Sequence, residues 1–319
     1  MREPGFWYRP AGWQSALLTP LAWVYSGLTA RRVRQAPTYT GKVPVICIGN
    51  INAGGTGKTP TCIALAQYLQ QRNHKVHIVS RGYGGTLQGP TQVDEANHSA
   101  DQTGDEPLLL SAFAPTWIAK DRAAGVRAAE AAGATVILLD DGFQNPSVSK
   151  ALTVVVVDAT RGFGNGRVIP AGPLREPVDT GLKRADIALL IGDGEVPELR
   201  GRALTNGRLV PLQTGMTWAG LRVLAFAGIG NPSKFFATLR DLGAEIIKSE
   251  PLEDHQPLTP ALMKRLETEA KAQVAQLVTT EKDAVRLPDV FRSKVLTVPI
   301  RLEIEDWAQF DAAFEKVGL

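Results

Sequence analysis

The chain has 319 residues, a length that suits one large or two ordinary domains. Hydrophobic residues make up 44% and charged residues 21%, the composition of a soluble globular enzyme. The formal net charge of +3 is too small to indicate a nucleic-acid partner, and we expect none.

The positive charge is concentrated at the start of the chain. Residues 1–40 hold one acidic residue, Glu3, against five arginines, a local net charge of +4: Arg2, Arg9, Arg31, Arg32 and Arg34. No secretory signal with an A-x-A-type cleavage site is evident. The two cysteines, Cys47 and Cys62, are expected to be buried in a protein of a reducing compartment.

Residues 6–30 are crowded with aromatic and aliphatic side chains, and arginines follow at once. This pattern favours a helix in the membrane interface, with aromatic rings at headgroup depth and arginines on anionic lipid. A helix packed on the protein is the second possibility. Gln14, Ser15, Thr19 and Pro20 argue against a full span, which needs about 20 apolar residues.

The segment Asn52–Pro60 has the features of a P-loop. Apolar residues from Val43 to Ile48 predict a strand before it, and Thr59–Arg72 predicts a helix after it. Glycines let backbone N–H groups converge on a phosphate, and the helix adds the positive end of its dipole. Lys58 is expected to contact the β- and γ-phosphates, and the Thr59 hydroxyl to hold Mg²⁺. The common pattern has glycine where this chain has Asn52, a residue that tolerates left-handed backbone.

Short apolar strands alternate with helical segments through the next hundred residues, which predicts a parallel sheet covered on both faces. The predicted strands are Val76–Ser80, Trp117–Ala119, Val136–Leu139 and Thr153–Val157, and the predicted helices are Asp105–Phe113 and Asp121–Ala132. Asp140 and Asp141 follow one strand in a Walker-B arrangement, which places a carboxylate near Mg²⁺. The sequence leaves open which of the two contacts the metal.

Other polar residues stand where these strands end, the edge at which such sheets bind ligands. Arg81 begins a glycine-rich loop that suits an anionic ligand or is an ordinary loop. Asp105 is either a helix N-cap or a general base facing the γ-phosphate. Lys120 and Arg122 suit phosphate oxygens, although surface cations are common.

A long Gly/Pro-rich segment, residues 163–177, contains Arg167 and Arg175 and is a candidate substrate lip. After it the pattern restarts with strands at Leu221–Ala227, Glu245–Lys248 and Ala275–Thr279, which predicts a second, smaller α/β unit. His255 lies in a loop of this unit that can face a cleft. We divide the chain into a membrane-association segment, a P-loop domain, a smaller α/β domain and a closing helix: residues 1–40, 41–210, 211–302 and 303–319.

Taken together and in order, seven motifs and the aromatic N-terminal segment resemble those of the tetraacyldisaccharide 4′-kinase family, the lipid A 4′-kinases. The motifs are GNINAGGTGKTP (Gly49–Pro60), SRGYGG (Ser80–Gly85), GDEP (Gly104–Pro107), LDDGFQ (Leu139–Gln144), PAGPLREP (Pro170–Pro177), DH (Asp254–His255) and TTEKDAVRL (Thr279–Leu287). Each motif is weak alone, whereas the ordered set is specific. Asn52 belongs to the family's own form of the P-loop.

The resemblance implies a P-loop kinase on the cytoplasmic face of the bacterial inner membrane. Its acceptor is an acylated glucosamine disaccharide 1-phosphate, its cofactors are ATP and Mg²⁺, and anionic lipid is a partner. Asp105 matches the catalytic aspartate and His255 its partner. The resemblance also implies that paired strands, Leu209–Gln213 and Thr297–Leu302, link the domains, and that the final helix returns to the first domain. Implied site residues are, for the nucleotide, Asn52, Ala53, Gly54, Gly55, Thr56, Gly57, Lys58 and Thr59; for the metal, Thr59, Asp140 and Asp141; and for the substrate, Arg81, Lys120, Arg122, Gln144 and Arg175.

The alternative is a soluble P-loop NTPase or ligase that resembles the dethiobiotin-synthetase group. That group shares the Gly-Gly-Thr-Gly-Lys-Thr core, but it predicts neither the aromatic, basic N-terminus nor the Gly/Pro-rich segment. A nucleotide-binding module without enzymatic activity is disfavoured by the many charged residues at strand ends.

Overall fold

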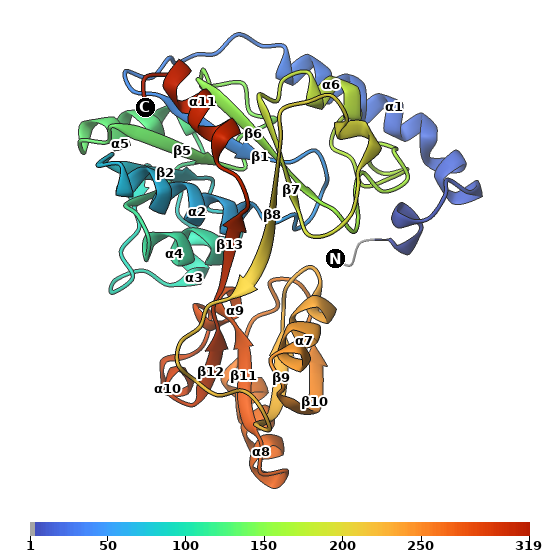
Figure 1. The fold of residues 1–319 in the computed structure, drawn as a ribbon, viewed down its shortest axis with the longest axis vertical. Helices are drawn as coiled ribbons and strands as arrows, with labels where there is room; N and C mark the ends of the chain where they lie inside the picture. Colours follow the sequence, from blue (N-terminus) through green and yellow to red (C-terminus); the bar gives the residue numbers. More distant parts are fainter. Residues whose placement is uncertain (1–3) are drawn as a thin grey trace.

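A computed structural model describes residues 4–319. Arg2 and Glu3, which entered the charge count above, lie outside the described residues. The chain builds two sheets of unequal size (Figure 1). The α/β class and the P-loop-type sheet predicted from the sequence are confirmed.

The larger sheet has nine strands in the order β13-β8-β7-β6-β1-β5-β2-β4-β3. All neighbours pair in parallel except β3 and β13 at the two edges, which are antiparallel to β4 and β8. The strands are β1 (Val45–Gly49), β2 (Val76–Ser80), β3 (Thr91–Gln92), β4 (Thr116–Ile118), β5 (Val136–Asp140), β6 (Leu152–Asp158), β7 (Ile187–Ile191), β8 (Leu204–Pro211) and β13 (Ile300–Ile304).

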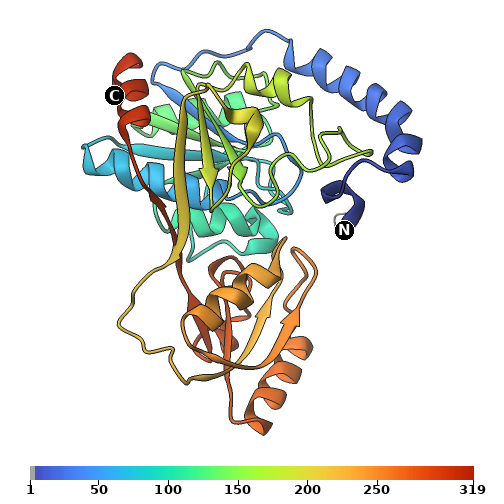
Figure 2. The ribbon, with the colours of Figure 1, turned by 45° about the vertical axis from the view of Figure 1, so that its right-hand side comes forward.

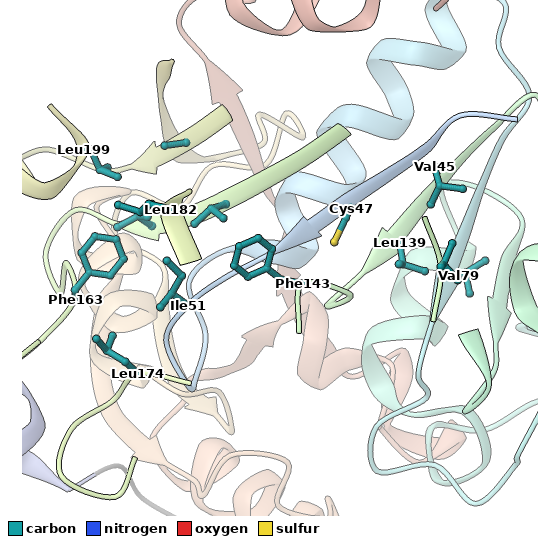
Figure 3. Packing of buried hydrophobic residues seen from close by; sticks show 14 of the residues in the cluster. Val45, Cys47, Ile51, Val79, Leu139, Phe143, Phe163, Leu174, Leu182 and Leu199 are labelled. Atoms are coloured by element: carbon teal, nitrogen blue, oxygen red, sulfur yellow. The ribbon is translucent and has the colours of Figure 1, made fainter. Parts of the chain in front are cut away.

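The strands β1, β2, β5, β6 and β7 are buried on both faces, which is why they are nearly continuous apolar runs. Successive side chains of β1 point to opposite faces: Val45 and Cys47 enter one core cluster, and Ile46 and Ile48 enter the other. Figure 3 shows the first cluster, with Phe143 next to β1.

Helices cover the two faces of the larger sheet. One face carries α2 (Lys58–Gln71), α4 (Asp105–Ser111) and α11 (Ala308–Lys316), and the other carries α1 (Trp13–Val33), α5 (Arg122–Ala131) and α6 (Val178–Leu182). Shorter elements are η1 (Gly5–Tyr8), α3 (Ala100–Thr103) and η2 (Pro197–Leu199). The predicted strands and helices are all present in this part of the chain, with ends that differ by one or a few residues.

The smaller sheet has four parallel strands in the order β10-β9-β11-β12, with helices on both faces. Its strands are β9 (Arg222–Ala227), β10 (Glu245–Pro251), β11 (Gln276–Thr280) and β12 (Val295–Val298), and its helices are α7 (Pro232–Asp241), α8 (Pro260–Ala272), α9 (Glu281–Ala284) and α10 (Asp289–Arg292). The chain enters this unit through β8 and leaves it through β13 (Figure 2).

β8 and β13 form an antiparallel pair within the larger sheet, with Leu209 opposite Leu302. After β13 the chain remains on the larger sheet, where the Trp307 ring stacks on the Tyr68 ring of α2 at 3.6 Å between ring centroids. Residues 300–302, which the predicted boundary places in the smaller domain, pair with β8 of the larger sheet. We therefore propose 212–299 as the smaller domain.

Helix α1 is apolar on its exposed side. Small residues face the protein, namely Ser15, Ala22 and Thr29. Six large apolar residues are more than half exposed: Trp13 75%, Leu17 72%, Leu21 59%, Trp23 72%, Val24 62% and Leu28 64%. Within residues 4–319, no helix is long and apolar enough to cross a bilayer.

Candidate active site

The P-loop connects β1 to α2 at the carboxyl end of the larger sheet. Gly57 is the residue before α2 and has a φ of 100°, a left-handed conformation that favours glycine. A Cβ at this position would stand 2.6 Å from Ile191 Cδ1. Lys58 and Thr59 then begin α2, so the first N–H groups of this 14-residue helix point toward the loop.

The first half of the loop is held by the Gly/Pro-rich segment. The Asn52 side chain donates to the carbonyl of Gly162 at 3.0 Å, and the Ala53 N–H donates to the carbonyl of Pro173 at 2.7 Å. Asn52 does not have a left-handed backbone. In this loop Gly54 and Gly57 have it. One N–H of the Asn52 side chain and the Ala53 N–H are thus engaged within the protein, and the nucleotide contacts of these two residues stay predictions. Amides from Gly54 onward remain for a phosphate.

The second half of the loop is braced from inside. Asn50 is fully buried, and its Nδ2 donates to the carbonyl of Gly54 at 3.2 Å and to Thr56 Oγ1 at 3.1 Å. Gly55, by contrast, is exposed, and a Cβ there would meet open space. Asn50 therefore fixes the backbone of the loop from the protein side, while Gly55 stays accessible to solvent.

Asp140 ends β5 and is buried. Its Oδ2 accepts a hydrogen bond from Ser80 Oγ at 2.9 Å. Burial, together with the charges of Glu106 and Asp141, raises the pKa of Asp140 to about 6. A buried carboxylate with two acidic neighbours favours a bound cation.

Asp141 is the next residue and has a φ of 49°, which is unusual for a residue other than glycine. Arg175 contacts both of its carboxylate oxygens, at 2.8 and 3.1 Å, and Lys58 Nζ lies 3.7 Å from Oδ1. Burial would raise the pKa of Asp141, but Lys58 and Arg175 lower it to about 2. Asp141 of the Walker-B motif therefore contacts both Lys58 of the P-loop and Arg175 of the Gly/Pro-rich segment.

These groups fit a divalent magnesium ion. Asp140 supplies carboxylate oxygens in an acidic surrounding, and Thr59 supplies a hydroxyl next to Lys58. Among residues 4–319 there is no group of three His, Cys, Asp or Glu arranged to hold a metal. Magnesium is commonly bound by one or two carboxylates, with water and substrate phosphates completing its shell.

Asp105 begins α4 and lies opposite a histidine from the smaller sheet. His255 Nδ1 is 2.9 Å from Asp105 Oδ2, across 150 residues of sequence. The Asp105 side chain is 3% exposed. Burial would raise its pKa, but the hydrogen bond from His255 and the charges of Lys282 and Arg286 lower it, so the carboxylate is ionised at neutral pH.

The glycine-rich loop after β2 positions Asp105. A Cβ at Gly85 would come within 2.5 Å of the Gln102 carbonyl oxygen, and one at Gly104 within 2.5 Å of the Tyr83 carbonyl oxygen. The two backbone segments can approach this closely only as glycines. The sequence left open whether this loop is an anion site or an ordinary loop. In the structure its glycines allow close packing of the backbone next to Asp105.

Three charged residues of this site were not among the predicted site residues. Lys282 Nζ lies 3.2 Å from Glu106 Oε1 and 3.4 Å from His255 Nε2, and Arg286 Nε lies 3.6 Å from Asp105 Oδ2. Lys282 and Arg286 belong to the TTEKDAVRL motif, whose mixed charges were the signal available in the sequence. A further contact between the two units joins Lys234 Nζ to Asp158 Oδ2 at 2.6 Å.

The five predicted substrate residues divide into two groups. Arg81 and Lys120 are exposed at strand ends, and Arg175 is bound to Asp141. Arg122 and Gln144 are buried instead. Arg122 donates to the carbonyls of Ala119 and Asp140, and Gln144 donates to Asn50 and Glu176.

The burial of Arg122 and Gln144 speaks against a direct substrate contact, which stays a prediction for both residues. The Arg122 guanidinium donates its hydrogen bonds to backbone carbonyls at the strand ends. Gln144 Oε1 accepts from Arg175 at 3.3 Å. Arg122 thus contacts the backbone of Asp140, and Gln144 contacts the side chain of Arg175.

The chain is similar to known proteins in sequence and in fold. A sequence model described as tetraacyldisaccharide-1-P 4′-kinase matches residues 14–318. The chain is 59% identical to the tetraacyldisaccharide 4′-kinase of Jannaschia sp., over 99% of both chains. It is 58% identical to that of Dinoroseobacter shibae, over 99% of this chain and 97% of the relative. Among solved structures, LpxK from Aquifex aeolicus has the same fold, with a TM-score of 0.77 and 23% identity over 96% of this chain and 99% of that chain.

Proposed function

The chain belongs to the tetraacyldisaccharide-1-P 4′-kinase family, and we propose that Asp105 is the general base of its reaction. The protein is an ATP-dependent kinase that phosphorylates the 4′-hydroxyl of a tetraacyldisaccharide 1-phosphate in lipid A biosynthesis. The observation that carries the proposed role is the contact between Asp105 and His255, which joins α4 of the larger unit to a loop of the smaller one.

Phosphoryl transfer depends mainly on alignment and charge neutralisation. Lys58 and the amides from Gly54 to Thr59 hold the β- and γ-phosphates. Asp140, Asp141 and Thr59 are the residues that would hold Mg²⁺, which neutralises charge on the phosphate oxygens when bound. Since Lys58 and Arg175 share Asp141, Lys58 exchanges this carboxylate for phosphate oxygens when the nucleotide enters.

Asp105 accepts the proton of the acceptor hydroxyl. Its Oδ2 is bonded to His255 and its Oδ1 accepts the Glu106 N–H at 3.0 Å, which leaves lone pairs on Oδ1 for the hydroxyl. Glu106 is close enough to Asp140 to raise its pKa, so the base stands within electrostatic reach of the metal-binding carboxylate. Arg81, Lys120 and, once released from Asp141, Arg175 are the cations proposed for the acceptor phosphate or the transferring group.

The test is a kinase assay of Asp105→Asn with ATP and the acylated disaccharide. We expect kcat to fall at least about a hundredfold, since general bases contribute about 10²- to 10⁴-fold. Asp101→Asn, in the exposed first turn of α3, is the matched control and retains activity. Near-normal turnover of Asp105→Asn would reject Asp105 as the base. ATP hydrolysis that ignores the acylated sugar would favour the soluble NTPase alternative.

We further propose that α1 lies on the cytoplasmic face of the inner membrane with its apolar side in the interface. Its exposed tryptophans and leucines precede Arg31 and Arg32 in the last turn, which suits anionic lipid. The helix contacts the Gly/Pro-rich segment, because Ser15 Oγ donates to the Ala171 carbonyl at 2.6 Å. The acyl chains of the acceptor would thus remain in the bilayer next to the segment that carries Arg175.

Flotation with anionic vesicles tests this placement. Leu21→Glu/Leu28→Glu puts two charges on the exposed side, and we expect most of the protein to leave the vesicle fraction. Val274→Glu is the control, because Val274 is 82% exposed on the smaller unit, away from α1. Unchanged flotation of the double variant would exclude α1 as the membrane contact.

A further inference from the structure

His255 is surrounded by charged groups from both units. Its Nδ1 faces Asp105 of α4, and its Nε2 faces Lys282 of α9 at 3.4 Å and Asp254 of its own loop at 3.7 Å. The Tyr83 ring meets it edge-on, with ring centroids 5.9 Å apart. His255 has a φ of 58°, so its backbone is also held in an unusual conformation.

Lys282 contacts three members of this cluster, namely His255, Glu106 and Asp254. Its side chain is only 21% exposed, and its ammonium lies near Glu106 at 3.2 Å and near Asp254 at 3.8 Å. Burial would lower the pKa of Lys282, but Glu106, Asp105 and Asp254 raise it, so the side chain is charged at neutral pH. Neither the P-loop nor the proposed acceptor contacts require this lysine.

The donor and acceptor properties of these groups restrict the state of His255. An ammonium group has three donors and no acceptor, so its contact with Nε2 requires a lone pair there. The proton of a neutral imidazole then resides on Nδ1, where it can donate to the Asp105 carboxylate. An imidazolium would instead place an Nε2–H against the Lys282 ammonium.

We propose that Lys282 is a positioning residue that, when His255 is neutral, holds it as the tautomer protonated on Nδ1 and aimed at Asp105. The inference rests on the proposed function, in which Asp105 is the base. In the transfer step the 4′-hydroxyl proton moves to an Asp105 oxygen while the hydroxyl oxygen bonds to phosphorus and the bond to ADP breaks. His255 keeps its proton throughout, and Lys282 keeps its three.

Opposing effects act on the histidine. The hydrogen bond to Asp105 raises the pKa of His255, whereas burial and the charge of Lys282 lower it, and the first effect is the larger. Removal of the ammonium therefore raises this pKa further. A charge at 3.4 Å changes it by about one unit even with the dielectric screening of water.

Nitrogen NMR of the histidine side chains tests the proposal without any acceptor. The chain has four histidines, so His255 is identified by comparison with His255→Ala. At alkaline pH, where the imidazole is neutral, we expect a proton on Nδ1 and none on Nε2. In Lys282→Met we expect the His255 pKa to rise by about one unit or more. The acidic limb of the kcat/KM profile should move upward with it.

Two further variants make the result specific. Lys282→Arg keeps the charge and should restore the wild-type pKa of His255 and the wild-type pH profile, which a purely structural role does not predict. Lys271→Met removes a 72% exposed lysine of the same unit and should leave His255 unchanged. Wild-type protein with a proton on Nε2, or an unchanged His255 pKa in Lys282→Met, would overturn the proposal.

The two proposals fail separately. If the NMR results are as expected but wild-type protein transfers no phosphate to the acylated disaccharide, the proposed function is wrong and the assigned tautomer stands. If transfer is normal and the tautomer is wrong, only the role of Lys282 is lost.

Discussion

At the scale of single residues, position in the chain does not distinguish a ligand-binding cation from a buried one. Lys120 and Arg122 both follow β4, and only Lys120 is exposed. Arg122 turns inward because two backbone carbonyls at the strand ends lack donors, and its guanidinium supplies them. Burial lowers the pKa of Arg122, while Asp140 and Asp141 counteract this effect.

Arg122→Met should consequently act on stability. It leaves the carbonyls of Ala119 and Asp140 without a side-chain donor, and we expect the free energy of unfolding to fall by about 2–4 kcal/mol. Urea denaturation measures this. Arg127→Met on the same helix removes only an exposed stacking contact with Tyr39, and should cost less than about 1 kcal/mol. Unchanged stability with a raised KM for the acceptor would return Arg122 to the substrate site.

The site itself was predictable to different degrees. Lys58, Asp140 and Asp141 follow from local patterns, because a strand and an adjacent loop or helix fix their place in the sheet. The Asp105–His255 pairing spans 150 residues and came from the family resemblance, since no local spacing encodes it. The importance of Lys282 and Arg286 emerged only from the fold, because a short charged helix has the same pattern when it faces solvent.

At the scale of elements, α1 reverses the usual amphipathic arrangement. Its buried positions are the small residues Ser15, Ala22 and Thr29, with Leu18 and Tyr25 packed beside them, while six large apolar residues are exposed. The sequence therefore predicted an interfacial helix without showing which side docks. Ser15 is fully buried at this contact, with its hydroxyl 2.6 Å from the Ala171 carbonyl oxygen. Trp7 Nε1 extends the contact by donating to Pro170 at 3.1 Å.

A larger side chain at this position should release α1. In Ser15→Leu the added methyl groups have no space against residues 163–175, and overpacking of this kind costs about 1–3 kcal/mol. We expect trypsin to cleave after Arg31, Arg32 or Arg34 sooner than in the wild type. Leu17→Ser is the control, because Leu17 is 72% exposed. Equal cleavage rates in the two variants would mean that Ser15 does not hold the helix.

At the scale of the whole molecule, the proposed reaction requires both units, because Asp105 lies in one and His255 in the other. The chain passes between them only through β8 and the start of β13, and charged pairs bridge the units: Asp105 with His255, Glu106 with Lys282, and Asp158 with Lys234. The α/β class and the two-unit plan followed from alternating strand and helix patterns. The assignment of β13 to the larger sheet did not, since an edge strand of five residues carries little pattern of its own.

The Asp105–His255 contact makes docking of the two units depend on pH. The pKa of Asp105 is lowered from 3.8, so its contribution is present above that pH and is lost as pH falls through the lowered value. The pKa of His255 is raised from 6.5, so its charged contribution is full below pH 6.5 and is lost as pH rises through the raised value. Docking should therefore be firmest between these limits and weaker in alkali.

Small-angle scattering of the nucleotide-free protein measures this change. We expect a larger radius of gyration at about pH 9 than at about pH 5.5, with only partial opening because Lys234 still bridges to Asp158. His255→Gln keeps a side-chain donor toward Asp105 but does not titrate, so its radius should be the same at both pH values. A wild-type radius that does not change, or a His255→Gln radius that changes as much as the wild type, would mean that this pair does not control docking.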